Sequence, residues 1–424
     1  MKSFFAFIFV VFFASITLAQ DQTQQTLDTQ GWIKQNSGTT HGLVGVSFNS
    51  SDTGWVAAAN IVLRTTDAGL HWSQISVPGG GILSISSVDG KTAWGGSYNN
   101  DGKVYFTGDG GQTWIPQNTN SQPEGVTAIS FPTRQNGFGV GHSFLIKTTN
   151  GGQEWTKYDI EGGDYHAVHF LDSQNGLIAG IGILLRVLLG GPARIPQKDP
   201  SFGTMTFYGC YLPTQTKEFA VGIEEPSPGV GLATIVRSIN SGSTWDKATI
   251  PLQFKNEVFD AITFTDSLRG TVVGSGGAIL NTSDGGDSWI IQASGVNTEL
   301  LSVSFSDSLN GTIVGELGII LRTTNGGYSW VQANNQYDSL SVQVYPDPGN
   351  QFLNLSYVLP IAQSVSLSIS DVAGNPIGQI LNNSFQDTGI NTVAINTSFY
   401  PSGSYYFQMR TSKYFANGQF TIVH

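Results

Sequence analysis

Carboxylates placed ahead of apolar segments are the side chains of this sequence with the clearest capacity for chemistry. Glu124, Glu257 and Glu299 each stand six or seven residues before a phenylalanine that ends an apolar run. Carboxylates that converge on one place focus negative potential and can bind cations or hydroxyl groups. Two of them at a suitable separation can also hydrolyse a glycosidic bond. Solvated loop charge is the alternative interpretation.

Other reactive side chains are few. The single cysteine, Cys210, lies in the apolar run Thr204–Leu212, and we expect a small buried side chain there rather than a nucleophile. His166 and His169 lie upstream, but the sequence does not place them beside it. The chain has no Gly-x-Ser-x-Gly motif, no phosphate loop and no histidine cluster. No catalytic residue, cofactor or metal site is therefore predicted.

The composition excludes one large class of partners. The chain has a net charge of −11, and its 19 lysines and arginines are scattered singly. Nucleic-acid binding needs basic clusters that displace counterions from phosphates, so we expect no nucleic-acid partner. The 53 glycines, together with many Ser, Thr and Asn residues and few charges, favour short strands joined by turns.

A repeated block indicates how those strands are organised. A segment of the form Thr/Ser-x-Asp/Asn-x-Gly-x-x-Trp recurs with Trp steps of 42, 41, 90, 44 and 41 residues, so a degenerate copy (Val187–Arg194) fits inside the double step. Four short strands in each unit of about 40–45 residues are typical of a propeller blade. The acidic or amide residue and the Trp of each block are Asp67 and Trp72, Asp109 and Trp114, Asn150 and Trp155, Asn240 and Trp245, Asp284 and Trp289, and Asn325 and Trp330.

The predicted fold class is all-β, with a seven-bladed β-propeller followed by a small immunoglobulin-like β-sandwich; eight blades are the alternative. Gly31–Gln35 resembles the strand that follows Trp330. We therefore expect the N-terminal strand to complete a blade begun at the C-terminal end of the repeats. Such a strand closes the ring and protects a sheet edge.

The block matches the Asp-box, or bacterial neuraminidase repeat. The wider pattern, seen best in Gly311–Trp330, resembles the photosystem II assembly-factor-like propellers over roughly residues 31–336. This resemblance implies that the boxes are structural and lie on the propeller face away from a ligand. It also implies an alternative role in assembling envelope complexes, since the photosynthetic members are thought to assist assembly of a membrane complex.

Two groups of glycoside hydrolases share the box. Sialidases resemble the chain in the repeat, and Arg194-Ile-Pro196 is similar to part of their Arg-Ile-Pro motif, although it lies mid-chain. Xyloglucanase-type enzymes use two facing propellers, whereas one is predicted here. The arginines that precede the boxes hold equivalent repeat positions, which indicates a structural role; they are Arg64, Arg186, Arg237 and Arg322. We expect a binding or scaffold protein, with a glycoside hydrolase as the alternative.

A ligand is expected on the face opposite the boxes. Turns between the second and third strands, and loops that lead into each first strand, would meet there. The candidate binding residues are Asn60, Asp101, His142, Glu124, Asp164, Tyr165, Glu224, Glu257, Glu299 and Glu316. The expected ligand is a protein or a glycan.

The two ends of the sequence indicate export. Residues 1–19 have the charge, apolar run and small cleavage-site residues of a signal peptide, and residues 20–30 form a linker to the propeller at 31–336. Residues 337–424 contain Tyr345-Pro-Asp-Pro348, an Asp371-Val-Ala-Gly374 turn and a final strand. This tail resembles the type A sorting domain of the type IX (Por) secretion system; an adhesive module is the alternative. The resemblance implies the type IX machinery as partner, and a secreted or outer-surface location in a Bacteroidetes-type bacterium. We expect no transmembrane segment in the mature chain.

Overall fold

The chain is nearly all β-structure and divides into two compact units, Lys34–Arg322 and a second that contains Thr323–His424. The computed structural model describes residues 31–58, 61–97, 102–120, 125–189, 202–227, 229–251, 254–327, 338–340, 342–345, 348–372, 375–411 and 414–424. The predicted signal peptide and linker lie outside these residues, as do Asn60, Asp101, Glu124, Arg194 and Trp330.

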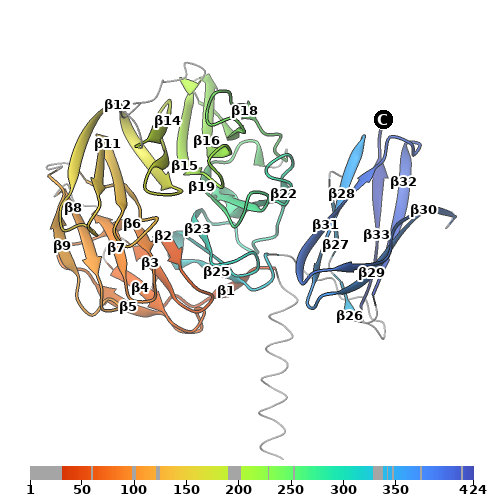
Figure 1. The fold of residues 1–424 in the computed structure, drawn as a ribbon, viewed down its shortest axis with the longest axis horizontal. Helices are drawn as coiled ribbons and strands as arrows, with labels where there is room; N and C mark the ends of the chain where they lie inside the picture. Colours follow the sequence, from red (N-terminus) through yellow and green to blue (C-terminus); the bar gives the residue numbers. More distant parts are fainter. Residues whose placement is uncertain are drawn as a thin grey trace, which may run out of the picture. The chain divides into compact units, whose positions relative to one another are not determined.

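Antiparallel sheets of short strands follow one another around the first unit (Figure 1). Four of them have four strands in chain order, with the first strand innermost. They are β2 (Leu43–Phe48), β3 (Gly54–Ala58), β4 (Ile61–Thr65) and β5 (Ser73–Ser76); β6 (Ile82–Ser87), β7 (Ala93–Ser97), β8 (Lys103–Thr107) and β9 (Ile115–Asn118); β15 (Met205–Tyr211), β16 (Glu218–Ser227), β17 (Val230–Ser238) and β18 (Asp246–Lys247); and β19 (Phe259–Phe264), β20 (Gly270–Gly274), β21 (Ala278–Thr282) and β22 (Ile290–Ile291).

One long strand links two successive groups. β10 (Ala128–Ser130), β11 (Gly137–Thr148), β12 (Thr156–Phe170), β13 (Asn175–Gly180) and β14 (Ile183–Leu188) form a single sheet. The first residues of β12 pair with β11, whereas Tyr165–Phe170 pair with β13. β12 is therefore the outer strand of one group and the inner strand of the next, which belongs to the degenerate repeat.

The N-terminal strand completes the last sheet, as predicted. Its order is β1 (Ile33–Gln35), β25 (Ile320–Thr323), β24 (Gly311–Gly315) and β23 (Leu300–Phe305). The Val46 and Phe48 N–H groups of β2 also donate to the Ser302 and Ser304 hydroxyls of β23, at 3.2 and 3.0 Å. These bonds join strands about 256 residues apart in sequence. The first and last sheets therefore lie side by side and close the ring.

A repeated serine joins neighbouring inner strands. An inner strand is a sheet edge, and its outward N–H groups need partners from outside the sheet. A serine hydroxyl at or next to the end of one inner strand accepts from an N–H at or just after the end of the next inner strand. The pairs are Ser304 with Phe48, Ser47 with Ser87, Ser86 with Phe131 and Ser130 with Phe170, at 3.0, 3.0, 3.1 and 3.0 Å. His169 Nδ1 accepts from the Leu212 N–H at 3.2 Å in the equivalent place.

The recurring Phe and Gly of each repeat have a packing reason. Phe48 pairs with Gly54 across the first two strands, and a Cβ atom on Gly54 would lie 2.3 Å from the phenyl ring. A side chain at this position would displace the ring from the core between the sheets. The same pairing occurs at Phe131 and Gly137, where the distance would be 2.2 Å.

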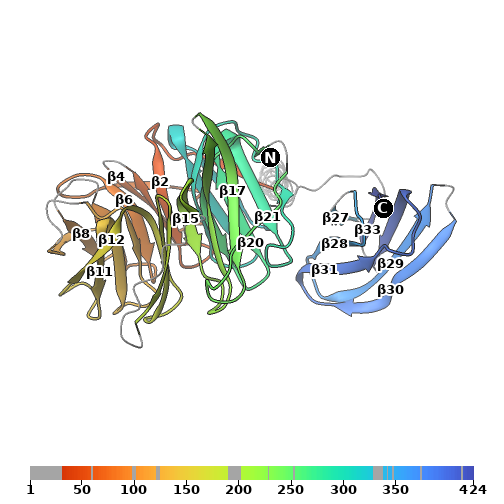
Figure 2. The ribbon, with the colours of Figure 1, turned by 90° about the horizontal axis from the view of Figure 1, so that it is seen from above.

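The strands run between the two faces of the ring, so the connecting turns lie on those faces (Figure 2). Two of these turns are short 3-10 helices, η3 (Ser275–Gly277) and η4 (Glu316–Gly318). Among the described residues, no helix has the length and apolar character needed to cross a membrane.

The second unit has two sheets around one apolar core. One has the order β26 (Asp338–Ser339), β33 (Tyr414–Ile422), β32 (Gly403–Arg410), β29 (Gln363–Asp371) and β30 (Pro376–Gln386); the other is β27 (Val342–Tyr345), β28 (Phe352–Leu359) and β31 (Gly389–Asn396). Leu355 of β28, Leu367 of β29 and Phe407 of β32 share the core.

The run Leu381–Ile395 does not form a hairpin, although its apolar residues alternate. β30 pairs with β29, whereas β31 pairs with β28 in the other sheet. β30 is an edge strand with mostly exposed or half-buried side chains, while β31 buries Ile395 in the core between the sheets. Adjacent strands with alternating apolar residues do not by themselves reveal that the chain crosses between sheets.

Candidate functional site

The Asp-boxes are tight turns whose polar atoms bond to one another. Thr65 Oγ1 donates to Asp67 Oδ1 at 2.8 Å and accepts from the Gly69 N–H at 2.8 Å, while the His71 N–H donates to Asp67 Oδ1. The glycine bond recurs in all six described boxes, at 2.7–2.9 Å. In the second box the Thr113 hydroxyl and N–H hold the pKa of Asp109 down, at about 2. The hydroxyl and the acidic or amide side chain of each box thus form their hydrogen bonds within their own turn.

Each box lies on the same ring face as the turn between the first two strands of its repeat. The Ala68 N–H donates to the Asp52 carbonyl, and the Gly151 N–H donates to the Gln135 carbonyl. We call this the box face. The turns between second and third strands, and the segments that enter the inner strands, lie on the opposite face because successive strands are antiparallel.

The arginines before the boxes join neighbouring repeats. Arg64 donates to the Gly90 carbonyl and Arg322 to the Ser51 carbonyl, each at 2.7 Å. Arg186 donates to the Gln215 carbonyl at 3.0 Å, and Arg237 to the Gly285 carbonyl at 3.3 Å. These guanidinium groups are occupied between sheets, which is the structural role expected from their spacing.

The predicted opposite-face residues meet only in part. His142 Nδ1 and Asp164 Oδ1 are 2.6 Å apart. Glu257 accepts from the Ser275 hydroxyl at 2.6 Å, and Glu224 pairs with Lys247 Nζ at 2.7 Å. Glu316 packs against Gly42, and Glu299 is exposed. Tyr165 is fully buried, and burial raises the pKa of its phenol to about 12. Asn60, Asp101 and Glu124 lie outside the described residues.

A set of residues that sequence reasoning missed lies along the inner strands. Six of these strands bulge at an equivalent point, where one residue is left out of the pairing with the second strand. A bulge re-aims the extra side chain and is common beside functional sites. We call the bulged residues the inner collar; they are Val44, Leu83, His166, Tyr208, Asp260 and Leu301. All six are half-buried or exposed.

The inner collar has a polar arc and an apolar arc. His166, Tyr208 and Asp260 come from β12, β15 and β19, which follow one another around the ring. Leu301, Val44 and Leu83 come from β23, β2 and β6, which are also successive neighbours. Repeats of similar sequence thus place polar side chains on one side of the collar and apolar side chains on the other.

Charge and unpaired atoms concentrate in the polar arc. The rings of His166 and Tyr208 stack, with centroids 5.3 Å apart and planes at 5°. Burial, and then the charge of Glu299, raise the pKa of Asp260 to about 7. Burial and the charges of Asp260, Glu225 and Glu299 raise the pKa of Tyr208, while burial lowers that of His166.

Two polar atoms of this arc are buried without a hydrogen-bond partner among the described residues. They are Asp260 Oδ2 and His166 Nδ1. A buried polar atom without a partner is costly, and such atoms call for an explanation. A ligand donor placed in the arc would satisfy the Asp260 carboxylate.

Cys210 is buried, as predicted, and its Sγ–H donates to the Leu177 carbonyl at 3.4 Å. Burial strongly raises the pKa of the thiol, which keeps it protonated and unreactive. His169 contacts it through the backbone and is itself buried, which lowers the pKa of its imidazole to about 4.

Two family models match the chain. Residues 237–340 match the model described as "Photosynthesis system II assembly factor YCF48", and residues 343–423 match the "Secretion system C-terminal sorting domain". Both resemblances inferred from the sequence motifs are thereby confirmed. The second match indicates export through the type IX secretion system, to the cell surface or the medium.

Known proteins with similar sequence or structure agree with the fold. The photosystem II assembly lipoprotein Ycf48 of Synechococcus sp. (strain CC9902) is 24% identical over 272 residues, 58% of this chain and 73% of that protein. A structure described as "YCF48 bound to D1 peptide" has a TM-score of 0.58 at 19% identity, covering 70% of this chain and 98% of that one. PorZ, a type IX secretion component of Porphyromonas gingivalis, has a TM-score of 0.53 at 14% identity, covering 89% and 59%. The predicted fold class, an all-β propeller protein, is confirmed.

Proposed function

We propose that this chain is an exported binding protein whose inner collar holds a basic segment of a partner protein. The observation that carries this proposal is the polar arc, in which three successive inner strands bring together His166, Tyr208 and Asp260. The propeller acts as a rigid frame for that arc, and the tail directs export. The boundaries 1–19, 20–30, 31–336 and 337–424 stay part of the proposal, with the first segment as a signal peptide.

Electrostatics favours a cationic ligand group. Asp260 carries a buried oxygen without a partner, and the charges of Glu225 and Glu299 act on the same arc. A guanidinium or ammonium group would offset the repulsion between these carboxylates, and the face of an aromatic ring such as Tyr208 attracts cations. A peptide ligand is supported by the similar propeller described as bound to a peptide.

A peptide titration tests the proposal. Fluorescence anisotropy of the full mature chain would compare a labelled Gly-Gly-Arg-Gly-Gly peptide with its Glu counterpart. We expect binding of the arginine peptide only, weakened by salt, and weakened about tenfold or more by Asp260→Asn because a buried charge pair is lost. The exposed Asp246 of β18 provides a matched control, Asp246→Asn, which should bind like the wild type. Equal binding of both peptides would contradict the proposal.

A glycoside hydrolase is the second candidate, and one observation favours it. Asp260 has a pKa of about 7 beside the charge of Glu299. A carboxyl group with a raised pKa can act as the general acid, while a second carboxylate serves as nucleophile or base. Turnover of a chromogenic glycoside that Asp260→Asn abolishes would replace the binding proposal with this one.

A further inference from the structure

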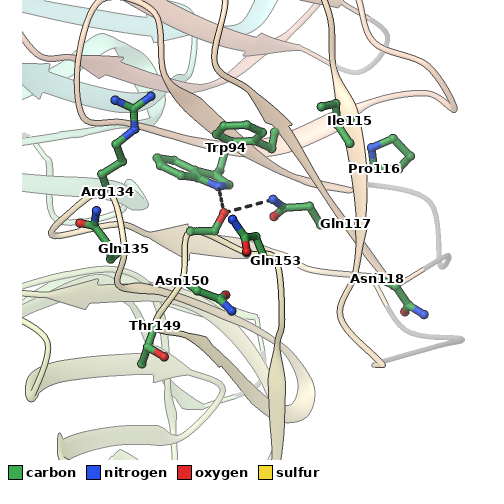
Figure 3. Close-up of a pocket in the computed structure, with 13 residues that line it drawn as sticks. Trp94, Ile115, Pro116, Gln117, Asn118, Arg134, Gln135, Thr149, Asn150 and Gln153 are labelled. Atoms are coloured by element: carbon green, nitrogen blue, oxygen red, sulfur yellow. Dashed lines mark hydrogen bonds between the residues drawn. The ribbon is translucent and has the colours of Figure 1, made fainter.

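A pocket of about 790 Å³ lies on the box face, between the outer strand β9 and the box that ends at Trp155 (Figure 3). Its size falls within the range of about 300–1,000 Å³ that small-ligand sites occupy. It is lined by β9, by the turn after β10 and by the box, and it is separate from the inner collar, whose six residues are absent from its lining.

The floor of this pocket is fixed by structure. Trp94 Nε1 and Gln117 Nε2 both donate to the Gly151 carbonyl, each at 3.1 Å (Figure 3). Gln117 Oε1 also accepts from Trp155 Nε1 at 3.3 Å. Trp94 is fully buried and stacks on Phe131, with ring centroids 3.8 Å apart. The pocket is therefore pre-formed rather than opened by movement of its base.

Amide groups dominate the wall. Five lining residues are Asn or Gln, and none is Asp or Glu; the five are Gln117, Asn118, Gln135, Asn150 and Gln153. The lining cation, Arg134, faces the Asp89 carboxylate at 3.8 Å. Ile115 adds an apolar side chain that is 55% exposed, next to the exposed Pro116. A low local charge in a chain of net charge −11 argues against an ionic ligand.

We propose that this pocket binds a neutral oligosaccharide. An amide carries a donor and an acceptor in one plane, a geometry that matches neighbouring hydroxyl groups of a sugar ring. Gln117 is used in the floor and the Asn150 oxygen in its own box, so the amides left for a sugar are those of Asn118, Gln135 and Gln153. Ile115 and Pro116 offer a surface for the apolar C–H face of the ring. This site goes beyond the proposed function, because it binds a different ligand and lies on the box face of the ring.

The same contact between an outer strand and the following box has a different side chain in the preceding repeat. There Ile75 takes the place of Gln117, and a Cβ on Gly111 would lie 2.7 Å from Ile75 Cδ1 and 3.1 Å from the Trp55 ring. The aliphatic side chain of Ile75 thus covers Gly111, whereas Gln117 covers the equivalent glycine of the next box. Gln112 of that box is the sequence equivalent of Gln153, so it provides a matched control.

Saturation-transfer NMR with the full mature chain tests the site. The probes are cellobiose, maltose, lactose and chitobiose at about 20 mM, suited to affinities in the millimolar range. We expect transfer to at least one disaccharide. The double variant Asn118→Ala, Gln153→Ala should weaken it by about threefold to tenfold, the effect of losing one or two neutral hydrogen bonds. Both side chains are exposed, so folding should be preserved.

The controls separate this proposal from the collar. Gln112→Ala and Asp260→Asn should leave saccharide binding unchanged, while the double variant should leave binding of the arginine peptide unchanged. Failure of all four sugars to bind, or binding that the double variant does not alter, would overturn the proposal. Displacement of bound sugar by the arginine peptide would also overturn it, since the pocket would then be a protein-binding surface.

Discussion

At the scale of single residues, the inner collar shows how one repeated position acquires different chemistry. The bulge places a residue at the inner edge of each strand whether it is Val44 or Asp260. Backbone geometry is thus set by the repeat, while the side chain is free to vary. Because the carboxyl group of Asp260 is buried and also feels the charge of Glu299, its pKa is raised and it retains a proton to near neutral pH.

Asp260→Asn should change how stability depends on pH. The pKa of Asp260 is about 7 in the folded chain and near 3.8 when unfolded, so the folded state holds the proton more tightly. Stability is therefore lost as pH rises from about 4 to about 7. An amide cannot ionise, so the variant should be more stable than the wild type by roughly 2–4 kcal/mol at pH 8 and about equal at pH 4.

Tryptophan fluorescence during urea unfolding would measure this difference. All nine tryptophans precede residue 331, so the signal reports the propeller and not the tail. Asp246→Asn, at an exposed position, should follow the wild-type curve at both pH values. A variant that loses stability at pH 8 would contradict this prediction and show that a favourable contact stabilises the Asp260 carboxylate in the folded chain.

The candidate site could be predicted from the sequence only in part. The positions of His142 and Asp164 in successive loops indicated one face, but their 2.6 Å contact depends on the irregular pairing of β11 with β12, in which the extra residues lie in β12. Asp260 was missed because a strict two-residue alternation has no place for a bulge. The signal that could have found it is its distance of four residues from Phe264, shared by His166 and Phe170.

At the scale of elements, the Asp-box is a self-contained turn. Its threonine or serine is the centre, since that hydroxyl donates to the Asp or Asn and accepts from the glycine N–H. The acidic residue is exchangeable with Asn, as Asn150 and Asn240 show by making the same bonds. The charge of the box is thus unnecessary for its fold.

Thr107→Val should destabilise the propeller by about 1–3 kcal/mol. The change keeps the shape of the side chain but leaves the buried Gly111 N–H without the hydroxyl that it reaches at 2.9 Å. Thr107 is fully buried, so water cannot substitute. The control is Thr113→Val in the same box, whose hydroxyl is exposed and should cost less than about 1 kcal/mol. Similar losses from both variants, in urea unfolding, would contradict this assignment.

The sequence predicts the order of strands within a repeat because characteristic turn residues separate one strand from the next. The exceptions arose where two elements share one continuous strand or change sheets. β12 runs through what the repeat pattern divides into two strands, and β31 leaves the sheet of β30. Both depend on which neighbouring strand is available, which a local pattern does not record.

At the scale of the molecule, the ring closes because the N-terminal strand β1 supplies the fourth strand of the last sheet. The likeness of Gly31–Gln35 to the strand after Trp330 predicted it, and β1 does pair with β25. Gln35 also donates to the Ala68 carbonyl at 2.9 Å and accepts from Trp72 Nε1 at 3.3 Å. Gln117 makes the equivalent contacts with Gly151 and Trp155, so closure uses the same contacts as one of the contacts between internal repeats.

Removal of β1 should therefore open the ring at one joint. A chain that begins at Asn36 would expose the edge of β25 and leave the Ala68 carbonyl and the Trp72 indole without Gln35. We expect it to unfold at lower urea concentration than a chain that begins at Gly31, and to self-associate, because an uncovered edge strand pairs with other chains. Light scattering and urea unfolding of the two chains would measure this.

Gln35→Ala tests the side-chain contacts alone. It should lower the stability of the contact between β1 and the first box without causing association, because the strand itself is kept. Identical behaviour of the chains that begin at Gly31 and Asn36 would mean that the inner-strand bonds of Ser302 and Ser304 to β2 suffice to hold the ring closed.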